Sequence, residues 1–241
     1  MNSIMNKTFL ITGASAGLGE KFTTLISDIA NNIVIIGRDK KKLIKLKKKI
    51  LKINLKVNVI YFTVDLSTSS GVNNLIKKFE KQKKIKFIDV LVNSAANFTV
   101  KKIENISSDQ IKRDFQLNVI SPFILSRHFG LKMKKKGGGL IFNIGSSSAY
   151  DCSESTSVYC STKHALLGMS KAFNSELKVH GVKSIFIAPG SMKTKMGRKV
   201  KNQDFNSFIE PEEVAILMKN LLKDEKSIFI DELKIKRAIY K

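Results

Sequence analysis

The sequence predicts a doubly wound α/β domain, with a parallel sheet of seven strands and helices on both faces. Two observations predict it: short apolar runs alternate with helical patterns along the chain, and runs such as Ile33–Ile36 lack polar alternation. Strict alternation implies parallel strands joined by right-handed crossovers, and unpatterned strands suit a sheet that is covered on both faces. No linker interrupts the 241 residues, of which 43% are hydrophobic, so we expect residues 1–241 to form a single domain.

The positions of the elements follow from the apolar runs and their periodicity. Strands are expected at residues 8–11, 33–37, 57–62, 88–92, 139–144, 183–188 and 228–230. Helices are expected at residues 18–30, 40–53, 69–83, 109–135, 156–179 and 211–222. Pro211 followed by Glu212 and Glu213 is a strong start signal, because proline fits the first turn and carboxylates favour the positive end of the helix dipole. The order is that of a Rossmann-like domain, in which ligands bind beyond the C-terminal ends of the strands.

A glycine-rich segment, Thr12–Gly19, directly follows the first strand. Gly13 permits a tight turn, Gly17 lets the backbone approach a pyrophosphate, and Gly19 lets the next helix lie close to the sheet. The helix N-terminus then presents free N–H groups to the anion. Taken alone, the segment fits an ordinary strand-to-helix turn equally well. The residues of this loop that we expect to bind a dinucleotide are Gly13, Ser15, Gly17, Leu18 and Gly19.

Polar residues also follow the next strands. Arg38 stands after the second strand, where an NADP site offers an arginine to the 2′-phosphate and an NAD site an acid to the ribose, so NADP(H) is favoured. Asp39 follows immediately and keeps NAD(H) as the alternative. After the third strand, Asp65 either accepts a hydrogen bond from an adenine amino group or caps the next helix, and Leu66 adjoins it. Asn93 ends the fourth strand, before small residues that let a cofactor pass close by.

The fifth strand leads to a hydroxyl, Ser146, and thirteen residues later to Tyr159. Tyr159 and Lys163 are four residues apart on one helical face. Because a phenol has a pKa near 10, it needs a nearby cation to work as an acid or base at neutral pH, and Lys163 is placed to supply one. Ser146 could then hydrogen-bond a substrate oxygen while Tyr159 exchanges its proton and a hydride passes to or from a nicotinamide.

The composition excludes several other classes. The net charge of +23 comes mainly from lysine, which with abundant isoleucine and asparagine is typical of an AT-rich coding sequence, so we expect solvated helix faces and no specific nucleic-acid partner. Cys152, Cys160 and the three histidines lack metal-ligand spacing, so no metal site is expected. No apolar stretch spans a membrane and the N-terminus leaves no room for a signal peptide, which predicts a cytoplasmic protein without membrane attachment.

Along nearly its whole length the chain resembles the short-chain dehydrogenase/reductase family. The motifs that carry the resemblance occur in family order: T-G-x-x-x-G-x-G at Thr12 to Gly19, Ser146, Y-x-x-x-K at Tyr159 and Lys163, and Pro189-Gly190 followed by Thr194. Two departures are an alanine, Ala96, in place of the last glycine of the family's N-N-A-G, and Gly145 where a serine is frequent.

The resemblance implies an NAD(P)(H)-dependent oxidoreductase that interconverts a carbonyl and an alcohol on a small-molecule substrate. It also implies that Asn118 helps a water molecule relay protons to Lys163, that Lys163 holds the nicotinamide ribose, and that Pro189, Gly190 and Thr194 line the nicotinamide side. Residues 191–208 would form a substrate lid. The two long helices would pair across a two-fold axis in a homodimer or homotetramer.

The sequence is also compatible with two alternative functions. One is a 3-oxoacyl-[acyl-carrier-protein] reductase, although the C-terminal segment Phe229–Arg237 lacks the glycine-containing end typical of those enzymes. Another is an NADP-binding protein that has lost catalysis, against which the complete set Ser146, Tyr159, Lys163 and Asn118 argues.

Overall fold

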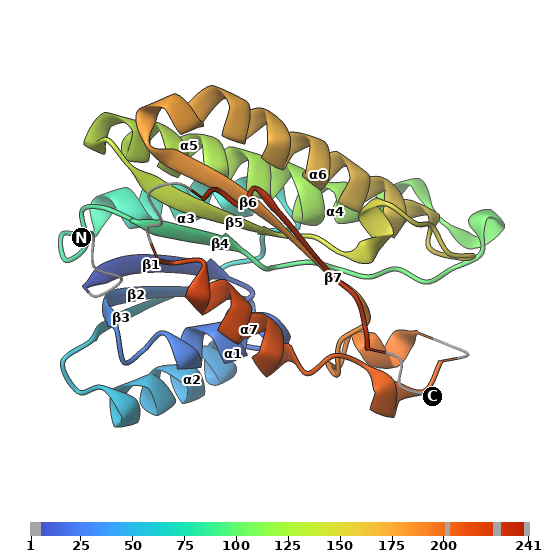
Figure 1. The fold of residues 1–241 in the computed structure, drawn as a ribbon, viewed down its shortest axis with the longest axis horizontal. Coiled ribbons are helices and arrows are strands. Elements are labelled where there is room, and N and C mark those ends of the chain that lie inside the picture. Colours follow the sequence, from blue (N-terminus) through green and yellow to red (C-terminus); the bar gives the residue numbers. More distant parts are fainter. Residues whose placement is uncertain (1–5, 201–202, 224–227, 239–241) are drawn as a thin grey trace.

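A computed structural model describes residues 6–200, 203–223 and 228–238 of the chain. Within them, seven parallel strands form one sheet in the order β3-β2-β1-β4-β5-β6-β7 (Figure 1). The strands are β1 Lys7–Thr12, β2 Ala30–Gly37, β3 Asn58–Thr63, β4 Val90–Asn93, β5 Gly139–Ile144, β6 Val182–Pro189 and β7 Glu232–Ile235. The predicted fold class is therefore confirmed.

Helices cover both faces of the sheet. They are α1 Gly17–Leu25, α2 Lys40–Ile53, α3 Ser69–Lys81, α4 Ser108–Phe115, α5 Ser121–Lys136, α6 Ser157–Leu177 and α7 Pro211–Asn220. In Figure 1, α1, α2 and α7 lie below the sheet, and α3 to α6 lie above it. Pro211 occupies the first turn of α7 ahead of Glu212 and Glu213, as predicted.

Side-chain alternation along the strands divides the core into two halves. Phe9 and Ile11 of β1 pack with α1, α2 and α7, whereas Leu10 between them packs with α3 and α5 on the other face. All three side chains are fully buried, which stabilises the fold by about 1.5–3 kcal/mol each. Because both faces of the sheet are buried, successive side chains of a strand all face the core. The strand sequences are therefore continuous apolar runs without polar alternation.

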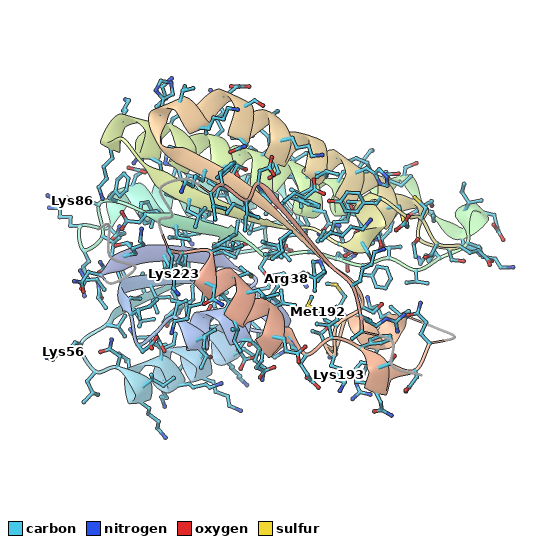
Figure 2. All side chains as sticks on the ribbon, in the orientation of Figure 1. Arg38, Lys56, Lys86, Met192, Lys193 and Lys223 are labelled. Atoms are coloured by element: carbon cyan, nitrogen blue, oxygen red, sulfur yellow. The ribbon has the colours of Figure 1, made fainter. Side chains whose placement is uncertain are left out.

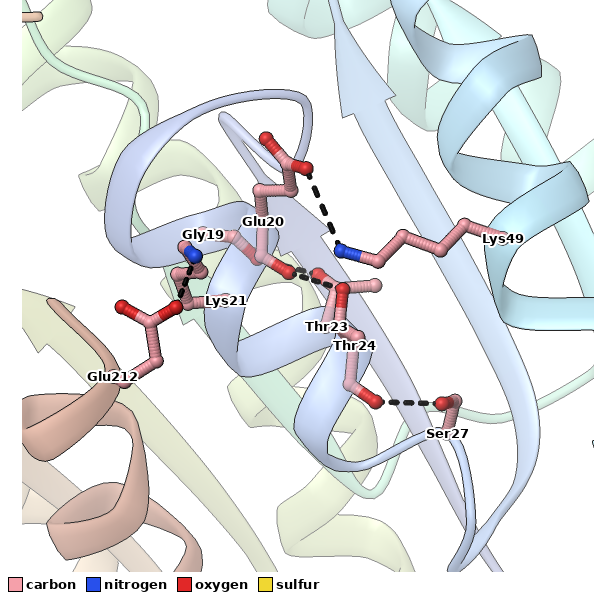
Figure 3. A network of polar contacts seen from close by, with 8 residues as sticks. All are labelled: Gly19, Glu20, Lys21, Thr23, Thr24, Ser27, Lys49 and Glu212. Carbon is pink, nitrogen blue, oxygen red and sulfur yellow. Dashed lines mark hydrogen bonds and ion pairs between the residues drawn. The ribbon is translucent and has the colours of Figure 1, made fainter. Parts of the chain in front are cut away.

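Polar contacts fix the ends and the flanks of the helices. Asp39, Thr68 and Ser107 cap α2, α3 and α4 by accepting hydrogen bonds from backbone N–H groups in the first turn. Figure 3 shows α1 linked to both of its neighbours: Lys21 pairs with Glu212 of α7, and Glu20 pairs with Lys49 of α2 at 3.9 Å.

The predicted helix 18–30 ends at Leu25, and β2 already begins at Ala30. Two other predicted elements also differ from the structure. The expected helix 109–135 is a helical run of three parts, in which a π-helical turn, Gln116–Ile120, joins α4 to α5. A π turn inserts one extra residue into an otherwise continuous helix, so a helical pattern on both sides of it predicts a single helix.

The last strand lies at Glu232–Ile235, not at residues 228–230. Ile228 is 62% exposed and makes no strand pairing, whereas Leu233 and Ile235 of the less apolar segment pack against the core. The edge strand is thus selected by alternation of its side chains rather than by total hydrophobicity.

Candidate active site

The glycine turn after β1 is packed against the segment that follows β4. Gly13 has φ +65°, and a Cβ there would lie 2.8 Å from the Ala95 nitrogen. A Cβ on Gly19 would lie 2.5 Å from the Gly13 carbonyl oxygen. The Thr12 hydroxyl fixes the contact by accepting hydrogen bonds from the N–H groups of Ser94 and Ala95 at 3.0 and 3.1 Å. Only glycine therefore fits at positions 13 and 19 without moving the backbone.

The first turn of α1 is open to an anion. Its N-cap residue, Ala16, has no side chain to accept a hydrogen bond from the first N–H groups of the helix. Gly17, with φ +55°, begins the helix and lines the adjoining cavity. An uncapped helix N-terminus with its positive dipole end has the features that suit a phosphate group.

A cavity of about 280 Å³ lies beyond the C-terminal ends of the strands. Nine of the residues predicted as site residues line it: Gly13, Ser15, Gly17, Leu18, Arg38, Leu66, Tyr159, Lys163 and Thr194. Residues outside the predicted catalytic and cofactor-binding set also line it: Ala16, Ile36, Gly37, Val64, Leu117, Ile144 and Gly145. So do Ser94, Ala95 and Ala96, which were predicted as small residues beside a cofactor, and Met192, Lys195 and Met196 of the predicted lid. Arg38 and Met192, both labelled in Figure 2, are among the residues that line this cavity. The cavity joins the glycine turn to the Tyr159–Lys163 pair.

Arg38 is exposed at the rim of the cavity, directly before the Asp39 cap of α2. Asp65 does not line the cavity, and its carboxylate accepts hydrogen bonds from the N–H and the hydroxyl of Ser67 at 2.9 and 2.7 Å. Partial burial raises the pKa of Asp65, but the Ser67 hydrogen bonds and the charges of Arg38 and Arg113 outweigh it and lower the pKa below its ordinary value. Asp65 is thus a carboxylate that already has partners.

Tyr159 and Lys163 lie one helical turn apart on α6 and are both buried. Lys163 Nζ donates to the Ile144 carbonyl at 2.8 Å and lies 5.4 Å from the centre of the Tyr159 ring. Burial lowers the pKa of Lys163 to about 7. Burial also raises the pKa of Tyr159 to about 12, against the opposing effect of a hydrogen bond with Ser146. At neutral pH the Tyr159 phenol therefore keeps its proton. It lies next to the Ser146 hydroxyl and near Lys163, whose pKa is close to neutral pH.

Ser146 stands between β5 and a short 3-10 turn, Ser147–Ala149, which it caps by accepting the Ser148 N–H at 3.1 Å. It does not line the cavity, but its hydrogen bond with Tyr159 brings it into the site. Gly145, before it, has no room for a side chain, because a Cβ would overlap the Phe186 ring. This packing explains the glycine at that position.

Asn118 lies in the π-helical turn, and its side chain forms two hydrogen bonds with the backbone of Asn97, in the segment that follows β4. Its Oδ1 accepts the Asn97 N–H at 2.8 Å, and its Nδ2 donates to the Asn97 carbonyl at 2.9 Å. The same Nδ2 donates to the Thr162 hydroxyl at 3.1 Å, next to Lys163 in sequence. Asn118 therefore joins the segment after β4 to α6 from outside the cavity lining.

Four of the predicted cofactor-binding residues that lie off the cavity have other contacts. The Asn93 side chain points into the core and donates to Ser126 Oγ and Asn143 Oδ1, both at 2.9 Å. Gly190 donates its N–H to the Ile235 carbonyl at 2.9 Å, after Pro189 at the end of β6. Gly19 packs on the Gly13 carbonyl. These residues shape the walls of the cavity without lining it.

One contact in the site has no signal in the sequence. The Phe98 ring packs edge-on against Tyr159, with centroids 4.6 Å apart and an interplanar angle of 67°. Of the segment predicted as a lid, Met192, Thr194, Lys195 and Met196 line the cavity. The rings of Phe205 and Phe208 contact each other, with centroids 5.3 Å apart, and neither residue lines the cavity. Residues 201–202 of that segment lie outside the described residues.

The family model described as short chain dehydrogenase matches residues 7–204. The chain belongs to the short-chain dehydrogenase family. The family, the fold and the oxidoreductase class predicted from the sequence are thereby confirmed.

Two relatives and one structure of similar fold illustrate the match. A 3-oxoacyl-[acyl-carrier-protein] reductase of Rickettsia typhi is 29% identical over 224 residues, which cover 89% of this chain and 88% of the relative. An uncharacterized oxidoreductase of Staphylococcus aureus is 25% identical over 236 residues, 98% and 99% of the two chains. The crystal structure of a metagenomic short-chain oxidoreductase in complex with NADP superposes with a TM-score of 0.84 at 22% identity, covering 98% and 100% of the chains.

Two further features are absent from the described residues. No helix in them is long and apolar enough to cross a membrane. Nor do they contain a group of three or more histidine, cysteine, aspartate or glutamate side chains that could hold a metal ion.

Proposed function

We propose that this short-chain dehydrogenase is an NADP(H)-preferring enzyme that interconverts a carbonyl and an alcohol on a small-molecule substrate. The observation that carries the proposal is that one cavity is lined at one end by the glycine turn and at the other by Tyr159 and Lys163. A dinucleotide site and a proton-transfer pair thus share one space, as hydride transfer to or from a bound substrate requires.

The residues present suit a dinucleotide. The open N-terminus of α1 and the turn at Gly13 and Gly17 would hold the pyrophosphate. Arg38, exposed at the rim, would meet a 2′-phosphate, which supports NADP(H) over NAD(H). Leu66 and Thr194 would line the adenine and nicotinamide ends. When bound, the nicotinamide supplies or accepts the hydride.

The proton belongs to the protein side of the reaction. Tyr159, which keeps its proton at neutral pH, would donate it to the oxygen of a carbonyl that is being reduced and recover it in the reverse direction. Ser146, already hydrogen-bonded to Tyr159, would hold the same oxygen. Lys163 would stabilise the phenolate as it forms, because a pKa of about 7 lets the amine take up a proton at physiological pH. Asn118 would position the wall from which water reaches Lys163.

Replacing the tyrosine tests this proposal most directly. Tyr159→Phe keeps the ring and its contact with Phe98 but removes the acid, so we expect turnover of a carbonyl panel to fall at least about 10³-fold. NADPH binding, followed by fluorescence titration, should stay within about two-fold of the wild type. Turnover that survives in the variant would refute the role of Tyr159, and failure of the wild type to bind NADPH or NADH would refute the cofactor assignment.

Two other functions are kept as alternatives. The match to a relative named as a 3-oxoacyl-[acyl-carrier-protein] reductase favours a thioester-bound substrate, and turnover of an acetoacetyl thioester far above that of free ketones would support it. Tight NADPH binding without turnover of any carbonyl would favour a non-catalytic NADP-binding protein.

The setting of the enzyme is also proposed. We infer a cytoplasmic homodimer or homotetramer without a specific nucleic-acid partner, in which residues 191–208 act as a substrate lid. Pairing through the long helices is supported by the exposed apolar side chains Ile120, Phe123 and Leu131 along α5 and its preceding turn. Light scattering of the purified protein would test the assembly.

A further inference from the structure

A carboxylate with no exposed surface lies beside the candidate site. Asp114, in the last turn of α4, is 0% exposed. Three neutral side chains donate to it: the Thr99 hydroxyl at 2.5 Å, and the amides of Asn97 and Gln110 at 2.7 and 2.9 Å. A buried carboxylate is retained only where its oxygens are satisfied, and hydrogen bonds to a charged acceptor are the stronger kind. In the part of the chain that the structure describes, none of these donors is a cation.

Two of these donors stand on either side of the ring that touches the tyrosine. Asn97 and Thr99 are the chain neighbours of Phe98, whose ring packs on Tyr159 with centroids 4.6 Å apart. Gln110 Nε2 also donates to the Thr99 hydroxyl at 3.2 Å, so the cluster closes on itself. The carboxylate therefore anchors the backbone on both sides of Phe98 and fixes how the ring meets Tyr159.

The Asp114 carboxylate is also linked to Asn118, through Asn97. Asn97 is held twice: its backbone N–H and carbonyl bind the Asn118 side chain, and its own side chain binds Asp114. Asp114 is the penultimate residue of α4, and Asn118 lies in the π-helical turn that follows this helix directly. Loss of the Asp114 acceptor would free the Asn97 side chain and loosen the Asn97 backbone, to which Asn118 is hydrogen-bonded.

We propose that Asp114 is a positioning residue of the active site, which holds Asn97–Thr99 so that Phe98 orients Tyr159 and Asn97 orients Asn118. Its effect on turnover rests on the proposed function. Its effect on the placement of Tyr159 is independent of the proposed function, because that placement can be measured without a substrate.

The test compares variants that change the cluster with one that changes a carboxylate elsewhere. Asp114→Asn keeps the shape but removes the charge, Asp114→Leu removes the acceptors, and Thr99→Val removes one donor. Asp89→Asn is the matched control. Asp89 precedes β4 at its other end and accepts the Thr8 N–H at 2.8 Å and Lys136 Nζ at 2.9 Å, so it is structural but remote from the cavity.

Kinetics and binding give the first readout. We expect kcat to fall about 10-fold in Asp114→Asn and about 100-fold in Asp114→Leu, as for a reacting group displaced by about an ångström. The KM for the substrate should change less than kcat, and the Kd for NADPH should stay within about two-fold, because Asp114 does not line the cavity. Asp89→Asn should lower stability and leave kcat unchanged.

Phenolate absorbance gives a second readout that needs neither substrate nor cofactor. The chain has four tyrosines and no tryptophan, so a titration of each variant, minus that of the same variant with Tyr159→Phe, isolates Tyr159. Burial raises the pKa of Tyr159 to about 12, and a loosened Phe98 admits water, so the pKa should fall toward the ordinary phenol value in the Asp114 variants.

An unchanged Tyr159 titration in Asp114→Asn and Asp114→Leu would overturn the proposal, as would an equal shift in Asp89→Asn. If Asp114→Leu fails to fold by circular dichroism, Asp114→Asn and Thr99→Val decide the question. If the wild type turns over no carbonyl, the proposed function fails while the titration still decides the role of Asp114.

Discussion

Replacing the buried lysine should stabilise the protein while abolishing its proposed activity. Lys163 is 2% exposed, and its hydrogen-bond partner in the described chain is the Ile144 carbonyl. Burial lowers its pKa from 10.5 to about 7, and at 1.36 kcal/mol per unit this corresponds to roughly 5 kcal/mol. Lys163→Met keeps the length of the side chain and removes the charge. Loss of the hydrogen bond to Ile144 offsets about 1–2 kcal/mol, which leaves a net gain of roughly 3 kcal/mol at pH 7.

The pH dependence follows from the direction of the shift. The folded pKa is lower than the unfolded one, so between about pH 7 and 10.5 the unfolded chain binds the proton and the folded protein does not. Over this window the wild type gains stability with rising pH by about 1.4 kcal/mol per unit from this group, and below the folded pKa the contribution is constant. Lys163→Met lacks this slope, so its advantage should shrink as the pH rises from 7 to 10.

Urea unfolding of the two proteins at several pH values measures the difference, in which all other titrations cancel. A gain of about 3 kcal/mol at pH 7 corresponds to a Tm rise of roughly 6–12 °C for a chain of this size. A variant that is no more stable than the wild type at pH 7, with a parallel pH dependence, would refute the argument from burial. Turnover should be lost in either case.

Three further substitutions test other parts of the structure. Gly13→Ala should abolish NADPH binding and lower the Tm, because its Cβ would meet the Ala95 backbone. Gly137→Ala is the control: Gly137 has φ +82° and no atom within 4 Å of a Cβ at that position, so this variant should lose only about 1–2 kcal/mol of stability to left-handed strain and should still bind NADPH. Arg38→Gln should raise the Kd for NADPH about 10- to 100-fold and leave that for NADH within about two-fold; equal changes for both nucleotides would contradict a 2′-phosphate contact. Glu212→Gln breaks the exposed ion pair with Lys21 and should lower the free energy of unfolding by at most about 1 kcal/mol. Thermal unfolding measures this loss, which should be smaller in high salt because salt screens the pair.

The sequence predicts those parts of the site that depend on local chemistry. Gly13 and Gly17 adopt positive φ values as the motif requires, and the i, i+4 spacing brings Tyr159 and Lys163 to one face of α6. Contacts made by tertiary packing leave no such signal. Phe98 reads as an apolar residue in an irregular segment, and only the pairing of that segment with α4 places its ring on Tyr159. Asn93 shows the converse, because this polar residue at a strand end donates its side-chain amide to Ser126 and Asn143 in the core and does not line the cavity.

The fit between Gly145 and Phe186 links the end of β5 to β6 beside the cavity, which Gly145 lines. A Cβ at position 145 would overlap the Phe186 ring, which is fully buried on β6. A serine can therefore stand at position 145 only in a chain that carries a smaller residue at 186. The two positions form a size-compensating pair, so changes at one are expected to accompany changes at the other as related sequences diverge, and an engineered serine at 145 would need a second substitution at 186 to be accepted.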